Sequence, residues 1–248
     1  MASDNAIELK NAFKSFGNTQ ILKGVDFTLR NGETLALLGD NGAGKSTLIK
    51  CLCGYEKFDS FDEFKISQIP IAKDKFNLLK ARDMGIEVVF QEGFLGGEQE
   101  IYRNIFATRH ITKFGLIDAK KEIGVANKIL KEFLGFSGAG LDATSKAKNL
   151  SGGEKQGLAI ARAIYFRSKI LILDEPTTAL GIDQSKRFMG YLKSLKEQNL
   201  STIVITHDLN QAFNIADKFV FLRGGKCQKE LPRNEISSLD ELYKAFYE

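Results

Sequence analysis

The stretch "TLALLGDNGAGKSTLIKCLC", Thr34–Cys53, decides the fold. It opens with a short apolar run, passes through a glycine-rich loop, and continues with an apolar-periodic segment typical of a helix. The loop fits the pattern G-x-x-x-x-G-K-[ST] at every fixed position, and the strand before it and helix after it are the required context. Glycines let backbone N–H groups face phosphate oxygens, and a helix N-terminus adds roughly half a positive charge. The stretch therefore predicts a site for a nucleoside triphosphate.

The loop also assigns chemistry to individual side chains. Lys45 is expected to bridge the β- and γ-phosphates, and the Ser46 hydroxyl to bind Mg²⁺. The plain alternative is an ordinary glycine-rich turn between a strand and a helix. The residues predicted to hold the nucleotide are Gly39, Asp40, Asn41, Gly42, Ala43, Gly44, Lys45, Ser46 and Thr47.

Further apolar runs outside this stretch predict a parallel sheet. They lie at Ile86–Gln91, Lys169–Glu175 and Thr202–His207, and each is nearly continuous, as in strands buried on both faces. Helical stretches separate them, so the fold class is α/β, doubly wound. Phe219–Lys226 adds a strand and a turn.

Two segments depart from this alternation. The N-terminal segment 6–33 alternates apolar and polar residues and contains Asn31-Gly32, which predicts an antiparallel β subdomain with hairpins. In the middle of the chain, "DAKKEIGVANKILKEFLGF" has apolar residues at helical spacing. We therefore predict one domain, 1–248, with a core of about 1–91 and 158–248 and an inserted helical subdomain of about 92–157. The apolar positions of the helix are Ile123, Ala126, Ile129, Leu130, Phe133 and Leu134.

Polar side chains follow the predicted strands where ligands bind in open α/β sheets. Asp174 suits the Mg²⁺ shell, and Glu175 is left to orient and deprotonate the attacking water. Gln91 is a candidate to touch Mg²⁺ or that water, and His207 to hydrogen-bond the γ-phosphate. The plain alternatives are solvated acids at a strand end and ordinary surface residues.

A second glycine-bearing segment, "NLSGGEKQG" at Asn149–Gly157, resembles another phosphate cradle. Ser151 and Glu154 fit a capping box that starts the next helix. That leaves Gly152 and Gly153 unexplained, since each glycine in a helix costs about 1 kcal/mol relative to alanine. They make sense where a ligand approaches the backbone closely, and a γ-phosphate is the natural candidate.

Composition narrows the classes further. The net charge of +4 is mild, and Lys and Arg are scattered, so nucleic acid is not an expected partner. Cys51, Cys53 and Cys227 make no disulfide framework, which fits a reducing compartment. No apolar run approaches the ~18–20 residues of a spanning helix, and the start lacks a signal-peptide core. We expect a cytosolic chain, attached to a membrane at most through another protein.

The order of these motifs resembles the ATP-binding cassette family, in which "LSGGEKQ" stands between a GxxxxGKS loop and "LILDEP". The resemblance covers nearly the whole chain, from "FKSFGNTQILKGVDF" to "FLRGGK". It implies that two copies stack head to tail, so that the partner's Ser151–Glu154 closes each P-loop site. It also implies that Phe16 stacks on adenine, although a core phenylalanine is the plain alternative. The segment after Gln91 is then expected to face a transmembrane permease.

Within that family, "EPTTALGIDQ", "GIEVVFQE" and "GLIDAKKE" are similar to the simple-sugar importer branch. This implies the ATP- and Mg²⁺-dependent subunit of a monosaccharide importer, a homodimer peripheral to the cytoplasmic face of the cell membrane. Permease subunits are the implied partners, and indirectly an extracytoplasmic solute-binding protein. Gly181 stands where the family usually has aspartate. A cassette for another solute (amino acid, lipid or an exported compound), a soluble cassette acting on DNA or ribosomes, and a non-hydrolysing regulator stay open as alternatives.

Overall fold

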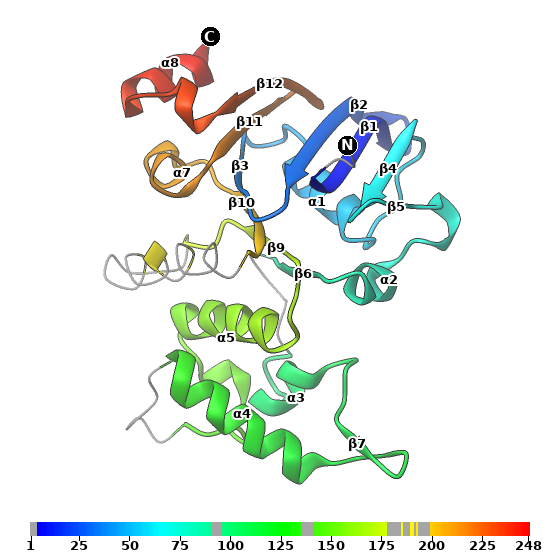
Figure 1. The fold of residues 1–248 in the computed structure, drawn as a ribbon, viewed down its shortest axis with the longest axis vertical. Helices are drawn as coiled ribbons and strands as arrows, with labels where there is room; N and C mark the ends of the chain where they lie inside the picture. Colours follow the sequence, from blue (N-terminus) through cyan, green and yellow to red (C-terminus); the bar gives the residue numbers. More distant parts are fainter. Residues whose placement is uncertain are drawn as a thin grey trace. The chain divides into compact units, whose positions relative to one another are not determined.

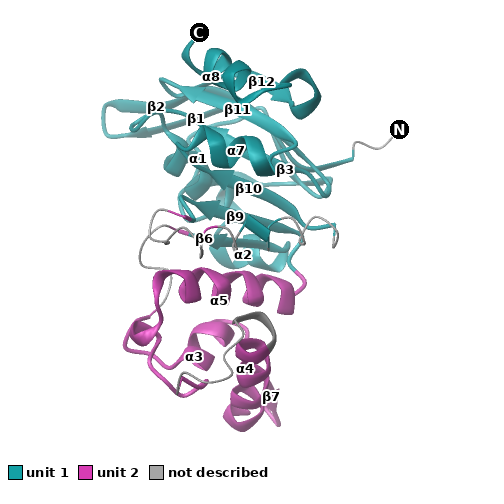
Figure 2. Cartoon of the chain, turned by 90° about the vertical axis from the view of Figure 1, so that its left-hand side faces the viewer, with its two compact units in different colours: residues 1–89, 168–176, 189–248 teal, residues 90–167, 177–188 magenta. Residues whose placement is uncertain are grey.

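The computed structural model describes residues 4–90, 96–134, 141–177 and 199–248, together with positions 185, 189, 190 and 192. Contacts divide the chain into two compact units, shown in two colours in Figure 2. Unit 1 comprises Met1–Val89, Ser168–Pro176 and Met189–Glu248, and unit 2 comprises Phe90–Arg167 and Thr177–Phe188.

A six-stranded sheet in the order β12-β11-β3-β10-β9-β6 forms the centre of unit 1 (Figure 1). Pairing is parallel from β11 through to β6, and β12 is an antiparallel edge strand. All residues of β3, β9 and β10 are buried, as their near-continuous Ile, Leu and Val sequence predicts. The strands are β3 (Thr34–Leu38), β6 (Ile86–Val89), β9 (Ile170–Asp174), β10 (Ser201–Ile205), β11 (Lys218–Arg223) and β12 (Lys226–Pro232).

The register of this sheet aligns the ends of the strands that carry the predicted chemistry. Ile205 of β10 pairs with Leu37 of β3 on one side and with Asp174 of β9 on the other. The P-loop, the acidic pair and His207 therefore follow the same edge of the sheet, its carboxyl edge.

The N-terminal antiparallel sheet has the order β2-β1-β4-β5, as predicted in kind. The strands are β1 (Asn5–Phe16), β2 (Thr19–Arg30), β4 (Glu63–Ile66) and β5 (Ile69–Pro70). The predicted role of Asn31-Gly32 as a hairpin turn is wrong, because this pair leads from β2 into β3, which belongs to the other sheet. The Gly32 N–H instead donates to Ser201 Oγ at 3.0 Å, and the β1–β2 hairpin turns at Gly17-Asn18.

Helices cover the large sheet of unit 1. One apolar cluster packs α7 and α8 against β3 and β11 through Leu209, Leu242 and Phe246 on the helices and Leu38 and Phe219 on the strands. The helices are α1 (Lys45–Leu52), α2 (Leu78–Asp83), α7 (Leu209–Ile215) and α8 (Leu239–Tyr247), with short 3₁₀ turns η1 (Lys73–Lys75) and η3 (Arg233–Glu235).

Unit 2 is mainly helical and has its own core. Its elements are α3 (Ile101–Phe106), β7 (Thr112–Lys113), β8 (Leu116–Ile117), α4 (Ala119–Leu134), η2 (Ala147–Asn149) and α5 (Gly152–Tyr165). The predicted helix is α4, in which Ala126, Ile129 and Leu130 are buried; the side chains of Phe133 and Leu134 lie outside the description. Leu158 and Ala161 of α5 join the same core, so unit 2 runs to Arg167 where the predicted insertion stops at 157. The β7–β8 hairpin was not predicted.

Across the described ranges, no helix is both long enough and apolar enough to cross a membrane.

Candidate functional site

The glycine-rich loop leaves β3 at Leu38 and enters α1 at Lys45, and two of its glycines fit only as glycine. A Cβ on Gly39 would lie 2.2 Å from the Leu222 carbonyl oxygen, because the loop passes directly over β11. Gly44 precedes α1 with φ 104°, a region that L side chains rarely adopt. The sequence thus forces the loop to turn at the sheet edge, directly before the first N–H groups of α1.

Lys45 is buried and folded back into this loop. Its ammonium donates to the carbonyl oxygens of Gly39 at 2.6 Å and Asp40 at 3.0 Å. Burial lowers the pKa of Lys45, and the nearby carboxylates of Glu175 and Asp174 oppose that effect. The cation is therefore held inside the predicted phosphate cradle by weak carbonyl partners that an anion can replace.

Asp174, at the end of β9, faces the start of α1. Its Oδ2 accepts a hydrogen bond from Ser46 Oγ at 3.5 Å. Burial raises the pKa of Asp174, and the neighbouring charge of Glu175 raises it further, while Ser46 and Lys45 act in the opposite direction. A buried carboxylate beside a second acid and a hydroxyl is a set of oxygen ligands, with the Lys45 ammonium as the nearby positive charge. These residues fit a hard cation such as Mg²⁺.

Glu175 and His207 form a pair beside that site. His207 Nδ1 lies 2.9 Å from Glu175 Oε1, with the histidine mostly exposed and the glutamate mostly buried. The Glu175 N–H donates to the Ile205 carbonyl oxygen at 3.0 Å, and its φ of 49° is unusual for a non-glycine residue. Asp208 caps α7 by accepting from the N–H groups of Asn210 and Gln211, which fixes where the chain turns after His207.

Ser151 and Glu154 make the predicted capping box at the start of α5 in unit 2. The Ser151 N–H donates to Glu154 Oε2 at 2.6 Å, and the Glu154 N–H donates to Ser151 Oγ at 3.4 Å. Gly152 and Gly153 lie in the first turn of the helix without a positive φ. Their backbone is thus one that alanine could adopt.

The other predicted residues are placed as follows. Phe16 ends β1 with 47% of its surface exposed, so it is not a core residue, and Lys14 Nζ lies 4.9 Å from its ring centroid. Gln91 lies outside the described residues, as does most of the turn that contains Gly181. The structure therefore brings together Lys45, Ser46, Asp174, Glu175 and His207 at one edge in unit 1.

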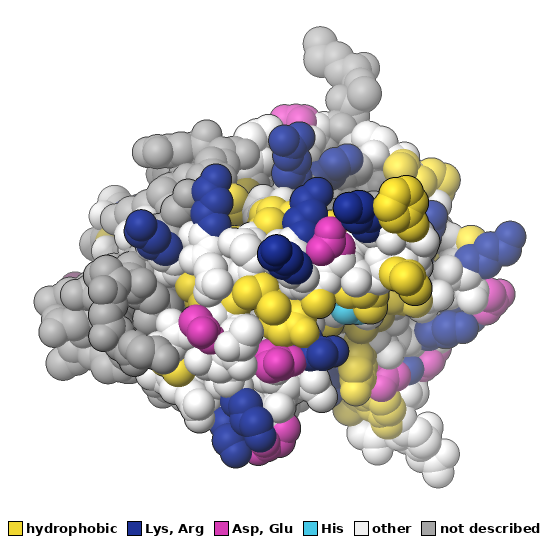
Figure 3. All heavy atoms as spheres, turned by 90° about the horizontal axis from the view of Figure 1, so that it is seen from below, with side chains coloured by type: hydrophobic (Ala, Val, Ile, Leu, Met, Phe, Trp, Pro, Cys, Tyr) yellow, Lys and Arg dark blue, Asp and Glu magenta, His cyan; other side chains and the backbone are white. Residues whose placement is uncertain are grey.

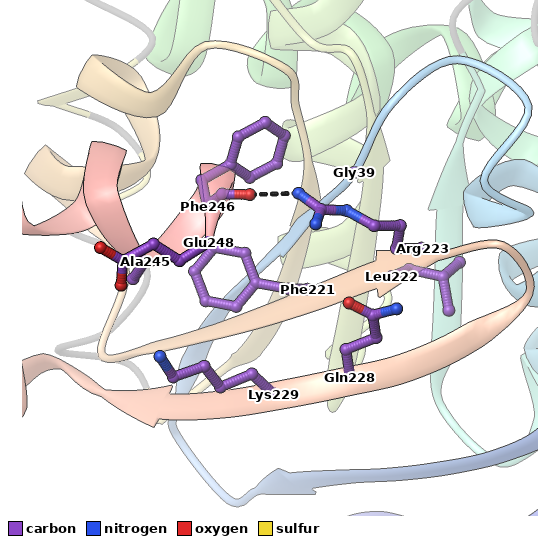
Figure 4. Close-up of a pocket in the computed structure, with 9 residues that line it drawn as sticks. All are labelled: Gly39, Phe221, Leu222, Arg223, Gln228, Lys229, Ala245, Phe246 and Glu248. Carbon is purple, nitrogen blue, oxygen red and sulfur yellow. Dashed lines mark hydrogen bonds between the residues drawn. The ribbon is translucent and has the colours of Figure 1, made fainter.

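Sequence reasoning missed the contact of His207 with Glu175, although both residues follow adjacent parallel strands, which was the available signal. It also missed a cavity of about 250 Å³ between β11, β12 and α8 (Figure 4). Arg223 reaches across this cavity and donates to the Phe246 carbonyl oxygen, which ties β11 to α8. Gly39 and the end of α8 both border this cavity.

Comparison with known proteins follows the same lines. The "ABC transporter" family model matches residues 22–178. The "Xylose/arabinose import ATP-binding protein XylG" of Sulfolobus acidocaldarius is 35% identical, over 97% of this chain and 94% of that protein. The "Ribose import ATP-binding protein RbsA" of Caldanaerobacter subterraneus subsp. tengcongensis is 38% identical over 96% of this chain. The chain spans only 47% of that second relative's length.

Solved structures agree in fold. A bacterial ABC transporter cassette, determined as a dimer, has a TM-score of 0.76 and 28% identity, over 92% of this chain and 98% of its own. A cassette in its ADP conformation has a TM-score of 0.77 at 23% identity, over 98% of this chain and 95% of its own, a likeness of fold alone. With the match of the family model over most of the chain, these findings show that the chain belongs to the ABC transporter family, as one of its ATP-binding cassettes.

Proposed function

We propose that this chain is the ATP-hydrolysing subunit of a monosaccharide importer and works as a head-to-tail homodimer on the cytoplasmic face of the cell membrane. The observation that carries the catalytic part is the convergence of Lys45, Ser46, Asp174, Glu175 and His207 at one carboxyl edge of the sheet.

In the nucleotide site, the P-loop backbone from Gly39 to Thr47 encloses the phosphates. Lys45 exchanges its two carbonyl partners for phosphate oxygens, a stronger charge-assisted interaction. Phe16, exposed at the end of β1, offers its ring to the adenine. Ser46 and Asp174 would hold Mg²⁺, with Gln91 as a further candidate ligand, and the ion would supply positive charge beside the phosphate oxygens.

Glu175 acts as the general base that takes a proton from the attacking water. The pair with His207 keeps its carboxylate aimed, since a ring N–H at Nδ1 donates to Oε1. When ATP is bound, the other ring nitrogen of the exposed histidine is available to the γ-phosphate. His207 is thus the residue that connects the base to the phosphate.

The second copy completes the site. Ser151, Gly152, Gly153 and Glu154 of each chain close over the γ-phosphate of the other, which gives the N–H groups at the start of α5 a ligand. The γ-phosphate supplies the differential contact that favours the closed dimer, and its release lets the copies separate.

The transport part rests on the relatives, whose names describe import of xylose, arabinose, ribose or galactose. None of them favours another solute, export, or a role on DNA or ribosomes. Permease subunits and a solute-binding protein are the partners that an importer of this kind needs.

The substitution Glu175→Gln tests the catalytic proposal. It keeps the size and the hydrogen bond but removes the base, so phosphate release should fall about 100-fold or more. The variant should accumulate as an ATP-bound dimer in size-exclusion chromatography. The control adds Lys45→Ala to Glu175→Gln, which should stay monomeric because it cannot hold ATP. A Glu175→Gln protein that stays monomeric in saturating ATP and Mg²⁺ would contradict the proposed dimer.

Uptake tests the solute class. Cells that lack this gene should lose accumulation of one labelled monosaccharide and regain it with the wild-type gene but not with Glu175→Gln. Unchanged uptake of xylose, arabinose, ribose and galactose would overturn the monosaccharide proposal and leave the ATPase standing.

A further inference from the structure

The β7–β8 hairpin of unit 2 turns at Phe114-Gly115 with φ values of 52° and 80°. Two positive φ values are typical of the tight hairpin turn that prefers Asn-Gly or Gly-Gly. For a bulky side chain such a backbone is strained. Among the described residues, Phe114 is the only apolar non-glycine residue with a positive φ; the others are Asn11, Ser67, Gln68, Thr108, Arg167, Glu175 and Asn199.

The strained residue gains nothing from burial. Phe114 is 95% exposed, and the two apolar residues that follow, Leu116 and Ile117, are 76% and 54% exposed. The β4–β5 hairpin in unit 1 makes a similar turn with the polar pair Ser67-Gln68. An apolar tip at a position that a polar residue would fill with less strain indicates an intermolecular contact.

The hairpin is held firmly at its base. The Asp118 N–H donates to the Ile111 carbonyl oxygen at 2.8 Å, and the Ile111 N–H donates to Glu122 Oε1 at 2.9 Å. His110 Nδ1 lies 3.1 Å from the same carboxylate oxygen, and Glu122 is buried. These contacts anchor the hairpin to the first turns of α4, so its tip projects without folding back.

The charge around the tip is positive. Lys113, Lys120 and Lys121 are exposed near the tip, and the acids of this segment are Asp118 and the buried Glu122 at the hairpin base. The Arg109 guanidinium lies 4.9 Å from the Phe166 ring centroid instead. Asp118 Oδ1 is engaged by the Lys121 N–H at the start of α4, and Lys113 Nζ lies 5.7 Å from the Phe114 ring centroid. Figure 3 shows Lys and Arg side chains, with Asp and Glu side chains among them, around exposed hydrophobic ones.

We propose that this hairpin contacts the lipid bilayer directly, with Phe114, Leu116 and Ile117 entering the headgroup region and the lysines binding the phosphates of anionic lipids. Basic side chains beside an aromatic and aliphatic tip are complementary to an anionic interface. A narrow convex tip is best contacted by a surface that deforms around it. Lipid does so readily, whereas a protein partner would need a pocket that matches the tip. The inference rests on the proposed function in one respect, the location of the chain beside a membrane.

Vesicle co-sedimentation of the purified full chain, without permease and without ATP, tests this contact. The chain should bind vesicles of phosphatidylglycerol and phosphatidylcholine more tightly than vesicles of phosphatidylcholine alone, and salt should weaken the binding. Phe114→Asn should reduce binding about tenfold, because it removes the largest apolar side chain from the interface. Asparagine tolerates a positive φ, so the melting temperature of the Phe114→Asn variant should equal or exceed that of the wild type.

Tyr247→Asn is the matched control, since Tyr247 is an aromatic residue 71% exposed on α8 in the other unit; it should leave vesicle binding unchanged. Substituting Lys120 and Lys121 together by glutamine should weaken binding to the anionic vesicles alone. Equal binding by Phe114→Asn and the wild type would overturn the proposal. So would binding that appears only when the vesicles contain the permease, which points to a protein partner. Phosphate release and ATP-driven dimerisation, measured without vesicles, report on the proposed function separately.

Discussion

Glycines occur at two helix starts for different physical reasons. One is the P-loop before α1, and the other is Ser151–Glu154 at the start of α5, here named the signature. In the P-loop, Gly39 lies against a backbone oxygen of β11 and Gly44 has a positive φ, so the fold itself requires them. In the signature, Gly152 and Gly153 have ordinary helical backbone, which alanine could also adopt.

The polar groups of the two segments differ in the same way. Ser151 and Glu154 satisfy each other in a closed capping box. Lys45 donates to carbonyl oxygens that phosphate oxygens could replace, and Asp174 is a buried acid whose pKa burial raises. The P-loop is thus suited to a ligand within its own unit. The signature is a stable helix start, and its backbone angles do not require glycine. The backbone angles of a motif therefore tell which of its glycines the fold itself requires and which are left to be explained by function.

Removing the Lys45 ammonium should have the largest effect. Lys45→Ala should lower phosphate release at least about 100-fold, because a donor to the transferring phosphoryl group is lost. Folding should suffer little, since burial disfavours the charged form of this lysine and lowers its pKa. Parallel phosphate-release and thermal-melting measurements check both halves. A large loss of melting temperature would mean that the Lys45 ammonium stabilises the fold. The P-loop would then not differ from the start of α5 in the way described.

Alanine in place of glycine should act with opposite signs on stability in the two segments. Gly39→Ala should destabilise by about 1–3 kcal/mol, as overpacking against a fixed backbone does. Gly152→Ala and Gly153→Ala should each stabilise by about 0.5–1 kcal/mol, since helical glycine is unfavourable relative to alanine. The signature variants should nonetheless lose ATP-driven dimerisation. Urea denaturation and size-exclusion chromatography separate these outcomes, and destabilised signature variants would break the comparison.

A smaller effect with a defined pH dependence is expected at Asp174. Because burial raises its pKa above the ordinary 3.8, the folded protein retains a proton that the unfolded chain has already released. Stability therefore falls as pH rises from 3.8 through the raised pKa. Asp174→Asn should melt above the wild type at pH 7, with the difference shrinking toward pH 4.

The control is Asp40→Asn, at an exposed position in the P-loop, which should change stability by no more than about 0.5 kcal/mol. An Asp174→Asn protein that melts below the wild type at every pH would contradict this. It would show that the folded protein stabilises the Asp174 carboxylate, so that its pKa is not raised.

Much of this architecture could be predicted from sequence because the decisive signals are local. Continuous Ile, Leu and Val predict the buried strands, and Ser151 and Glu154 alone predict the capping box. Asn31-Gly32 was misread because its local signal is that of a hairpin, whereas the next strand, β3, pairs with β10 and β11 from the far end of the chain. Tertiary pairing overrode the turn propensity.

At the site, the identities of Lys45, Ser46, Asp174 and Glu175 follow from motifs, but their present partners do not. The contact of Glu175 with His207 depends on the register of β9 against β10, and that of Lys45 on a loop conformation fixed by Leu222 of β11. Such contacts join residues that are distant in sequence, and no periodicity or spacing encodes them. The β7–β8 hairpin escaped prediction for the opposite reason, since a phenylalanine occupies the turn position where a polar residue gives the usual signal.

The position of β3 in the large sheet has a consequence for the order in which a newly made chain matures. Both of its neighbours, β10 and β11, come from residues beyond 200, and the Gly225 N–H donates to the Ala43 carbonyl oxygen inside the glycine-rich loop. Early in synthesis the ribosome has released the loop but not the strands that shape it. We therefore expect the loop to take its nucleotide-binding shape only after β10 and β11 have been made and have paired with β3.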